Sequence, residues 1–369
     1  MRKQRNPRGW RYVFVAVKSD LTRVAVIGGS GYTGLELVRL VLAHPGLELT
    51  YVTSERQAGK RVRDCFPFLP PYLSLEYQAF DLDAAVSKAD VFFLALPNGV
   101  SLSVTPKLRA SGKIVIDLSA DFRFQDLKIY ERIYGKSHID PSLAAEAVYG
   151  LPEIHRQAIR SASLIANPGC YATSIILGLL PCLQAGLLSD HLPIIADAKS
   201  GISGAGRKLE ATYLFTECDQ NIKPYSLGRQ HRHVPEIEQE LSLFAKTEIS
   251  VLFVPQLVPL RRGILSNIYV PLRPDHPSLD EIVDIYSRFY QHEPFVLVSP
   301  LGIIPCVKDV YLSNYCRLGL VLDQHTRTLI VVSVLDNLLK GAAGQAIQNL
   351  NIILGQDERA GLEFSVPYP

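Results

Sequence analysis

Residues 23–34 read Arg-Val-Ala-Val-Ile-Gly-Gly-Ser-Gly-Tyr-Thr-Gly, a short β-branched run that ends in a glycine-rich turn. A helical repeat of apolar residues follows over 35–42 and stops at the His-Pro-Gly of 44–46. The spacing G-x-G-x-x-G between a strand and a helix is typical of dinucleotide-binding turns, because glycine lets backbone N–H groups approach a pyrophosphate. We therefore predict that a dinucleotide binds at this turn, which comprises Gly28, Gly29, Ser30, Gly31, Tyr32, Thr33 and Gly34.

The first half of the chain continues with short apolar runs separated by helical patterns. Nearly all-apolar runs are typical of strands that are buried on both faces of a parallel sheet. The first predicted strand is 23–27, and further strands are predicted at 47–53, 91–95 and 113–118. Strands that alternate with helices predict an α/β fold with a Rossmann-type, doubly wound parallel sheet.

The second half of the chain has longer β-runs with few helices between them. Strands are predicted at 193–198, 249–258, 265–272, 311–322 and 328–334, and helices at 172–184, 235–245 and 279–290. This pattern predicts an α+β domain with a mixed or antiparallel sheet that is covered on one face. A last helix, predicted at 336–354, should pack back on the first domain. We expect a disordered basic tail at 1–20, a cofactor domain at 21–169 plus 336–369, and a catalytic and dimerisation domain at 170–335.

Composition excludes several classes of protein. Of the 369 residues, 47% are hydrophobic and 20% are charged, which excludes intrinsic disorder. The formal charge is +2, but residues 1–20 alone hold six basic side chains against one acidic one. The rest is therefore slightly acidic, and we expect no nucleic-acid partner. No run of about 18 apolar residues occurs, so we expect no membrane span. The six cysteines form no C-x-x-C pair, and we expect reduced thiols and a cytoplasmic location.

The residues after the second predicted strand indicate which dinucleotide binds. An NAD site usually offers a carboxylate to the ribose 2′-hydroxyl at this point, and that carboxylate repels a 2′-phosphate. Here the chain reads Thr-Ser-Glu-Arg over 53–56, followed by Lys60. Hydroxyls and cations suit a phosphate, so Ser54 and Arg56 predict NADP. Glu55 leaves NAD as the alternative.

Residues 167–173, Asn-Pro-Gly-Cys-Tyr-Ala-Thr, place a cysteine at the start of an apolar helix. Unpaired N–H groups and the positive end of the helix dipole lower the pKa of a thiol there and favour the thiolate. We therefore predict that Cys170 is a nucleophile. Cys182 and Cys316 lie inside apolar periodic segments, and we interpret them as core residues.

Two further polar segments supply candidate partners. His231 and His233 flank Arg232 in a polar loop, and one imidazole is a candidate acid/base partner of the thiolate. The spacing of His and Cys predicts no metal site. The glycine-rich run over 200–207 leaves free N–H groups for an oxygen-rich ligand, and Arg207 there and Arg123 elsewhere could clamp an anion.

Nine separate stretches occur in the order found in one known family: 28–34, 96–99, 117–123, 149–153, 167–171, 200–207, 231–236, 262–265 and 340–346. With them the chain resembles the N-acetyl-γ-glutamyl-phosphate reductases of arginine biosynthesis, within the semialdehyde dehydrogenase superfamily. The resemblance runs from about residue 24 to the end. Gly29 stands where the family often has alanine, and the basic tail has no family counterpart.

The resemblance implies NADPH-dependent reduction of N-acetylglutamyl 5-phosphate to the 5-semialdehyde, with phosphate released from a thioester on Cys170. It also implies a homodimer or homotetramer formed through the second domain. We predict His233 as the acid/base group and His231 as a residue that orients the substrate. Pro97, Asn98 and Gly204 are expected to join the cofactor site. The substrate is expected to contact Arg123, Asn167, Ser200, Gly201, Arg207 and His231.

Three alternatives stay open at this point. Aspartate-semialdehyde dehydrogenases typically have Asn-Cys-Thr in place of Pro-Gly-Cys-Tyr at 168–171. The amino-group-carrier reductase of lysine biosynthesis needs a surface for an acidic carrier protein. In that reductase we would expect a residue other than tyrosine at the position of Tyr171. A non-catalytic NADP-sensing protein would not need Cys170 together with the two histidines.

Overall fold

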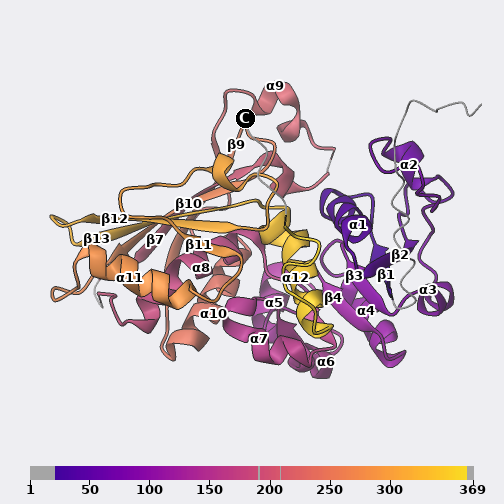
Figure 1. The fold of residues 1–369 in the computed structure, drawn as a ribbon, viewed down its shortest axis with the longest axis horizontal. Coiled ribbons are helices and arrows are strands. Elements are labelled where there is room, and N and C mark those ends of the chain that lie inside the picture. Colours follow the sequence, from indigo (N-terminus) through magenta and orange to yellow (C-terminus); the bar gives the residue numbers. More distant parts are fainter. Residues whose placement is uncertain (1–20, 190–191, 208, 364–369) are drawn as a thin grey trace, which may run out of the picture.

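A computed structural model describes residues 21–189, 192–207 and 209–363, so the predicted tail at 1–20 lies outside the described residues. Its first sheet has six parallel strands in the order β2-β1-β3-β4-β6-β5 (Figure 1). Their bounds are β1 (Thr22–Ile27), β2 (Leu47–Val52), β3 (Val91–Leu94), β4 (Ile114–Asp117), β5 (Val148–Tyr149) and β6 (Leu164–Ala166). Chain order reverses beside β1, as it does in doubly wound sheets that bind dinucleotides. The predicted parallel sheet is confirmed.

Helices cover both faces of this sheet because the strands are apolar on both sides. One face packs against α1 (Tyr32–Ala43), α7 (Pro152–Arg160) and α12 (Gly344–Ile353). The other packs against α3 (Leu82–Lys88), α4 (Ser101–Ala110) and α5 (Leu127–Tyr134). Short helices α2 (Val62–Cys65) and α6 (Pro141–Glu146) lie in the connections. Helices between these strands were expected, but their bounds were not predicted from the sequence.

The second sheet has seven strands in the order β11-β12-β13-β10-β7-β9-β8. Their bounds are β7 (Ile194–Gly201), β8 (Lys223–Pro224), β9 (Val251–Val258), β10 (Ile264–Pro271), β11 (Val296–Val298), β12 (Cys316–Asp323) and β13 (Thr328–Leu335). The pairs β7–β9 and β11–β12 are parallel and the others are antiparallel. The sheet is therefore mixed, which confirms one of the two predicted forms, mixed or antiparallel.

One face of the second sheet is covered and the other is largely open. The helices α8 (Cys170–Gln184), α10 (His233–Ala245) and α11 (Leu279–Tyr290) lie below the strands in Figure 1 and form the main core with them. A projecting arm with the short helix α9 (Phe215–Cys218) stands above the strands. Along β7 and β10 buried residues alternate with partly exposed ones, which is the pattern of a sheet with one covered face.

Two predicted elements differ most from the structure. The strand expected at 311–322 begins only at Cys316, because Leu312 adopts a left-handed conformation with φ 57° that does not continue a strand. The N–H of Leu312 instead donates to the Asp336 carboxylate at 2.9 Å. The last helix, expected at 336–354, is a π-helical turn (Leu339–Ala343) followed by α12.

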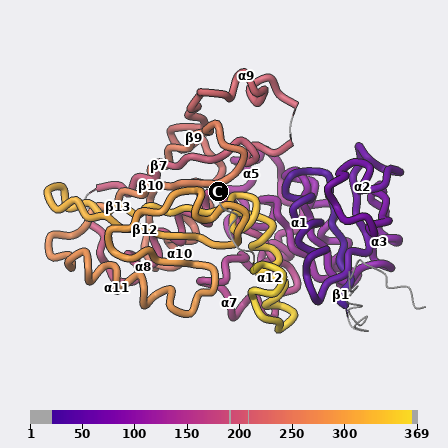
Figure 2. The backbone as a smooth tube through the Cα atoms, turned by 45° about the horizontal axis from the view of Figure 1, so that its top comes forward, coloured from indigo at the N-terminus to yellow at the C-terminus, as the bar shows by residue number. Residues whose placement is uncertain are grey.

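The last helix returns to the first half of the chain. α12 packs between α1 and α7 of the first sheet, as Figure 2 shows, and so confirms the expected return. The π-turn before it also contacts α8 of the second half. The site described below lies beside this junction. Among the helices of the described segments, none is long and apolar enough to cross a membrane.

Candidate active site

The loops that follow five of the parallel strands supply the predicted site residues of the first half, and three of these loops carry the cofactor turn, its neighbour and the nucleophile. The glycine-rich turn follows β1, Pro97 and Asn98 follow β3, and Cys170 follows β6. Because carboxyl ends of parallel strands meet at one edge of a sheet, these segments gather at the edge where ligands bind in such folds.

The turn at 28–34 can pack as closely as it does only because glycine stands at two of its positions. Gly28 has φ +89°, and a Cβ there would lie 2.4 Å from the carbonyl oxygen of Ala95. A Cβ on Gly34 would lie 2.2 Å from the carbonyl oxygen of Gly28. Helix α1 begins after Gly31 with no side-chain cap and no acidic residue in its first turn. Its first N–H groups therefore face an open cradle that fits the pyrophosphate of a dinucleotide.

The segment after β2 contains an exposed cation. Ser54 is buried, and its hydroxyl lies 2.7 Å from that of Ser30 in the turn. Arg56 is exposed and has no hydrogen bond or ion pair with any described residue. The Glu55 carboxylate accepts the N–H of Phe80 at 3.4 Å. A cavity of about 470 Å³ adjoins this segment. It is lined by Gln57, Gly59, Lys60, Arg61, Asp64, Cys65, Phe66, Glu76 and Arg207.

Pro97 and Asn98 form an exposed turn that is fixed from behind. The Asn98 side chain accepts the N–H of Ala120 at 3.0 Å. The N–H of Gly99 donates to the Asp121 carboxylate at 2.7 Å. These contacts hold the turn at the carboxyl edge of β3.

Cys170 is the first residue of α8, and the residue before it has to be glycine because His233 lies against it. A Cβ on Gly169 would lie 2.5 Å from Nε2 of His233, so only glycine lets this imidazole lie against the turn. The structure thereby brings His233 to the turn that carries the predicted nucleophile.

The environment of the thiol differs from the sequence-based expectation. Burial raises the pKa of the Cys170 thiol to about 11. The backbone N–H groups of Tyr171 and Cys170, and the charge of Arg123, lower this pKa, but less than burial raises it. The predicted effect of the helix start is present, yet it does not dominate. The prediction of a lowered thiol pKa is therefore wrong for this arrangement.

The two histidines occupy different surroundings. His231 is enclosed by aromatic rings, with ring centroids 5.0 Å from Phe253, 5.4 Å from Tyr225 and 5.7 Å from Tyr171. Its Nδ1 accepts the N–H of His233 at 3.1 Å. Burial, helped by His233 and Arg232, lowers the pKa of His231 to about 2, so this ring is neutral.

His233 stands at the start of α10, two residues earlier than the helix predicted at 235–245. Its Nδ1 is enclosed and has no hydrogen-bond partner among the described residues. Burial, together with Arg123 and Arg232, holds the pKa of His233 well below its usual value. A neutral imidazole can accept a proton, which a general base must do.

A buried carboxylate that sequence reasoning missed holds the nucleophile's turn. Glu236 is 0% exposed, and one of its oxygens accepts the N–H of Gly169 and the hydroxyl of Tyr149, both at 2.8 Å. Its other oxygen pairs with Arg123 at 3.1 Å. The available signal was the i, i+3 spacing from His233, which places both side chains on one face of a helix.

Arg123 and Asn167 are both buried in the protein behind Cys170. Each nitrogen of the Arg123 guanidinium donates within the protein, to Asn167 O, Glu236 and Leu118 O. The Asn167 amide donates to the carbonyl of Ala342 at 3.1 Å and accepts from Asn349 at 3.2 Å. Both residues thus tie the turn at 167–170 to its surroundings.

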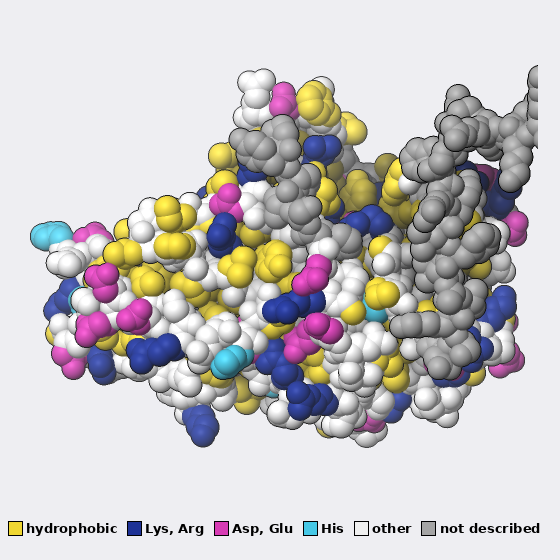
Figure 3. Space-filling model, viewed as in Figure 1, with side chains coloured by type: hydrophobic (Ala, Val, Ile, Leu, Met, Phe, Trp, Pro, Cys, Tyr) yellow, Lys and Arg dark blue, Asp and Glu magenta, His cyan; other side chains and the backbone are white. Residues whose placement is uncertain are grey.

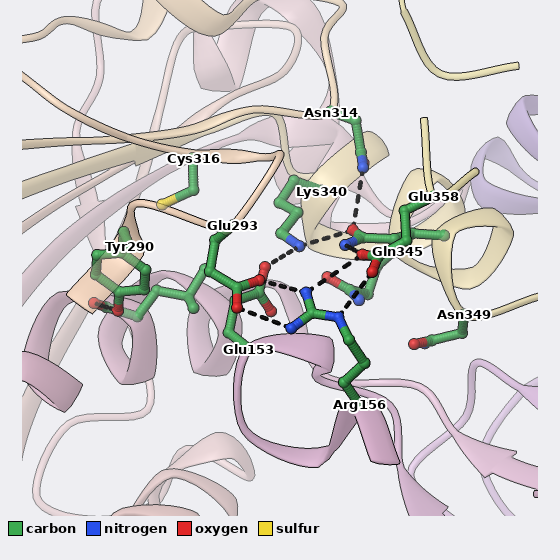
Figure 4. A network of polar contacts seen from close by, with 12 residues as sticks. Glu153, Arg156, Tyr290, Glu293, Asn314, Cys316, Lys340, Gln345, Asn349 and Glu358 are labelled. Carbon is green, nitrogen blue, oxygen red and sulfur yellow. Dashed lines mark hydrogen bonds and ion pairs between the residues drawn. The ribbon is translucent and has the colours of Figure 1, made fainter. Parts of the chain in front are cut away.

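The π-turn closes the other side of Cys170. A Cβ on Gly341 would lie 2.8 Å from the Cβ of Cys170. The turn is anchored by Lys340, whose ammonium pairs with Glu153 at 2.7 Å while both side chains are 0% exposed (Figure 4). The network continues through Arg156, which pairs with Glu293 and Glu358. It joins segments from both halves of the chain around the site.

The glycine-rich run over 200–207 begins at the buried end of β7 and continues into an exposed loop. Ser200 is buried, and a Cβ on Gly204 would lie 2.7 Å from its hydroxyl. The N–H of Gly201 donates to the carbonyl of Gly263 at 2.9 Å. Arg207 is exposed, donates to the carbonyl of Ser30 at 3.1 Å and lies over the ring of Phe66. The contacts of Arg207 are thus with the first half of the chain. In the described residues no group of three or more His, Cys, Asp or Glu could hold a metal ion.

Comparison with known proteins identifies the family. Residues 23–162 match the sequence model of the semialdehyde dehydrogenase NAD binding domain, and residues 170–337 match that of the semialdehyde dehydrogenase dimerisation domain. The N-acetyl-gamma-glutamyl-phosphate reductase of Geobacter metallireducens is 49% identical over 95% of this chain and 100% of its own length. That of Pelobacter propionicus is 48% identical over the same shares.

Solved structures agree on the fold. The aspartate semialdehyde dehydrogenase II of Vibrio cholerae has a TM-score of 0.70 at 20% identity, covering 91% of this chain and 99% of that one. The aspartate semialdehyde dehydrogenase of Candida albicans, solved with NADP, has a TM-score of 0.66 at 16% identity, covering 92% and 99%. With its sequence relatives and this shared fold, the chain belongs to the N-acetyl-γ-glutamyl-phosphate reductase family of semialdehyde dehydrogenases.

Proposed function

We propose that this protein reduces N-acetylglutamyl 5-phosphate to N-acetylglutamate 5-semialdehyde with NADPH, releasing phosphate, in arginine biosynthesis. The observation that carries the proposal is a cysteine at an uncapped helix start with a neutral imidazole against its turn. Full-length relatives that bear the reductase name support the substrate.

Attack on the acyl phosphate begins with a proton transfer between neutral partners. The Cys170 thiol has a raised pKa, and His233 is neutral, so the pair does not rest as a thiolate and an imidazolium. His233 takes the proton as the Sγ–C bond forms, and phosphate leaves to give a thioester on Cys170. The N–H groups at the start of α8, which has no side-chain cap, would stabilise the oxyanion. NADPH supplies the hydride that converts this thioester to the aldehyde. As the hydride arrives, His233 would give this proton to the carbonyl oxygen, and it would then carry the proton from that oxygen to Sγ of Cys170 when the C–S bond breaks and the aldehyde leaves.

The cofactor would be held by the turn at 28–34, by Pro97 and Asn98 beside it, and by Gly204 of the facing loop. The open cradle at the start of α1 fits a pyrophosphate. NADP rather than NAD is proposed because Arg56 is exposed and has no partner among the described residues, while the Glu55 carboxylate accepts the N–H of Phe80. Ser54 would join Arg56 at the 2′-phosphate if its hydroxyl turned from Ser30.

For the substrate we propose contacts with Ser200, Gly201, Arg207 and His231. The enclosed ring of His231 beside His233 suits a residue that orients rather than transfers protons. The bonds of Arg123 and Asn167 support a different contribution, which is to hold the turn of Cys170.

We propose a homodimer or homotetramer formed through the open face of the second sheet. Residues 170–337 match a dimerisation domain, and hydrophobic side chains gather over these strands in Figure 3. The arm adds Leu214 and Phe215, the latter 79% exposed. A cytoplasmic location is proposed from the six free thiols. The proposed domain limits, at 169 and 336, follow from the two sheets and the return of α12.

A comparison of two substrates tests the proposed function. Purified protein should oxidise NADPH with N-acetylglutamyl 5-phosphate, release one phosphate per NADPH, and turn over aspartyl phosphate at least about 100-fold more slowly. Preference for aspartyl phosphate would favour the aspartate-semialdehyde alternative. No oxidation with either substrate would contradict the reductase.

A further inference from the structure

We propose that the buried ion pair between Lys340 and Glu153 positions the nucleophile through the π-turn Leu339–Ala343. The pair fixes this turn to helix α7, and the turn holds the segment that carries Cys170. The inference rests on the proposed role of Cys170 and adds two positioning residues to it. Both side chains are 0% exposed, so they meet neither substrate nor cofactor and act through neighbouring residues.

The first step is that the π-turn touches the nucleophile's segment at two points. A Cβ on Gly341 would lie 2.8 Å from the Cβ of Cys170, so the backbone of the π-turn lies directly against the cysteine. The carbonyl of the next residue, Ala342, accepts the amide of Asn167 at 3.1 Å. A displacement of the π-turn therefore moves both the first and the last residue of the segment 167–170.

The second step is the geometry of the π-turn itself. The N–H of Gly341 donates to the carbonyl of Asp336 at 3.0 Å, and the N–H of Ala343 donates to that of Leu338 at 2.9 Å. Both bonds span five residues, one more than in an α-helix. Turns of this kind are rare, and many of them lie at functional sites. Because the backbone rarely adopts this geometry, contacts from outside the turn have to hold it in place.

The third step is the nature of the contact at residue 340. Lys340 is fully buried, its ammonium lies 5.9 Å from the ring centre of Phe295, and it donates to Gln348 at 2.9 Å. Figure 4 shows it reaching from the π-turn toward Glu153 on α7, with which it pairs at 2.7 Å. The cost of removing both charges from water offsets most of their attraction, so apolar residues would stabilise the fold about as well. Unlike an apolar contact, however, the ion pair fixes the distance between α7 and the π-turn.

This assignment predicts that stability and turnover respond differently to substitution. Lys340→Met leaves the Glu153 carboxylate buried without its cation, so the urea midpoint of unfolding should fall. Lys340→Met combined with Glu153→Leu removes both charges, so the midpoint should return close to that of the wild type. Gln348 keeps a partner in both proteins, since it accepts from Asn314 at 3.3 Å.

Turnover should not return with stability. In both proteins kcat should be lower by about tenfold or more, with KM within about twofold, because neither holds the π-turn against Cys170. A merely structural ion pair would recover kcat together with the urea midpoint in the double variant.

The experiment measures the release of phosphate without NADPH, because Cys170 acts in that step. Each protein is mixed with saturating N-acetylglutamyl 5-phosphate, and the burst rate, kcat and the urea midpoint are recorded. Arg156→Met is the matched control, since Arg156 lies on α7 in the same network but pairs with Glu293 and Glu358, which lie outside the π-turn. It should lower the urea midpoint and keep the burst rate. Both proteins with Lys340→Met should release phosphate about tenfold more slowly or less.

A double variant with the wild-type burst rate and kcat would overturn the proposal, as would an equal loss of burst rate in Arg156→Met. Should the Lys340 variants fail to fold, Gly341→Ala decides. Its added Cβ would meet Cys170 while the ion pair stays intact, so the burst should slow, and a wild-type burst rate there overturns the proposal. Failure of the proposed function has a separate signature, which is a wild-type protein that shows no burst and forms no acyl group on Cys170.

Discussion

The cofactor turn and the surroundings of Cys170 are built in opposite ways. The turn at 28–34 is contiguous in sequence and leaves the N–H groups at the start of α1 uncapped. The turn at 167–170 is held by residues distant in the chain, among them Arg123, Glu236 and Gly341, and its polar groups are largely bonded within the protein. A ligand site needs open donors, whereas a reactive thiol needs a partner held in place.

The largest effect should come from removing the nucleophile. Cys170→Ser should lower kcat by about 10⁴-fold or more, because a hydroxyl has a far higher pKa than a thiol and His233 is too weak a base for it. Steady-state assays measure this, with the exposed Cys306→Ser as the control that should keep activity. Near-normal turnover in Cys170→Ser would show that Cys170 is not the nucleophile, and the surroundings of this residue would then not be those of a reactive thiol.

The two histidines sharpen the description of the enclosed region. His233→Asn should lower kcat by about 10²–10⁴-fold with little change in KM, because this ring exchanges the proton. His231→Asn should mainly raise KM, because its ring only borders the substrate. Steady-state kinetics of both variants distinguishes them. The reverse pattern would exchange their roles.

Because the buried histidines are neutral, the free energy of unfolding should depend on pH. The folded pKa of His231 is about 2, so below pH 6.5 the unfolded chain binds a proton that the folded protein does not. Stability is therefore full above pH 6.5 and should fall as the pH decreases, by about 1.4 kcal/mol per pH unit for this group. Denaturant unfolding from pH 5 to 7 should show a shallower fall in His231→Gln. The exposed His325→Gln should keep the wild-type slope, and an equal slope in His231→Gln would contradict the buried neutral ring.

The smallest effect belongs to the open region. Arg56→Ala should raise the KM for NADPH by about tenfold and leave that for NADH unchanged, because a charge-assisted contact is lost only where the 2′-phosphate exists. Kinetics with both cofactors measures this, and the exposed Arg132→Ala on α5 is the control. Equal losses with both cofactors would make Arg56 structural.

The contrast between a contiguous turn and a site built from distant segments explains which features of the fold and the site the sequence predicts. The parallel sheet, the mixed sheet and the return of α12 follow from local patterns in contiguous segments. The spacing from His233 could place Glu236 on the same face of a helix, but it could not indicate the partners Gly169 and Arg123, which come from other segments. The raised thiol pKa escaped prediction for a similar reason, because burial depends on tertiary packing and outweighs the local helix start. Bounds were not predicted for helices α2 to α7, which have between 4 and 10 residues each.

A chemical-quench measurement tests the thioester on Cys170 most directly. Enzyme is mixed with N-acetylglutamyl 5-phosphate in the absence of NADPH, and released phosphate and the mass of the Cys170 peptide are followed. Since phosphate leaves before any hydride is needed, we predict a burst of one phosphate per site and an acyl group on Cys170, both absent in Cys170→Ser. A wild-type enzyme that releases no phosphate and carries no acyl group, yet turns over fully when NADPH is added, would contradict the account.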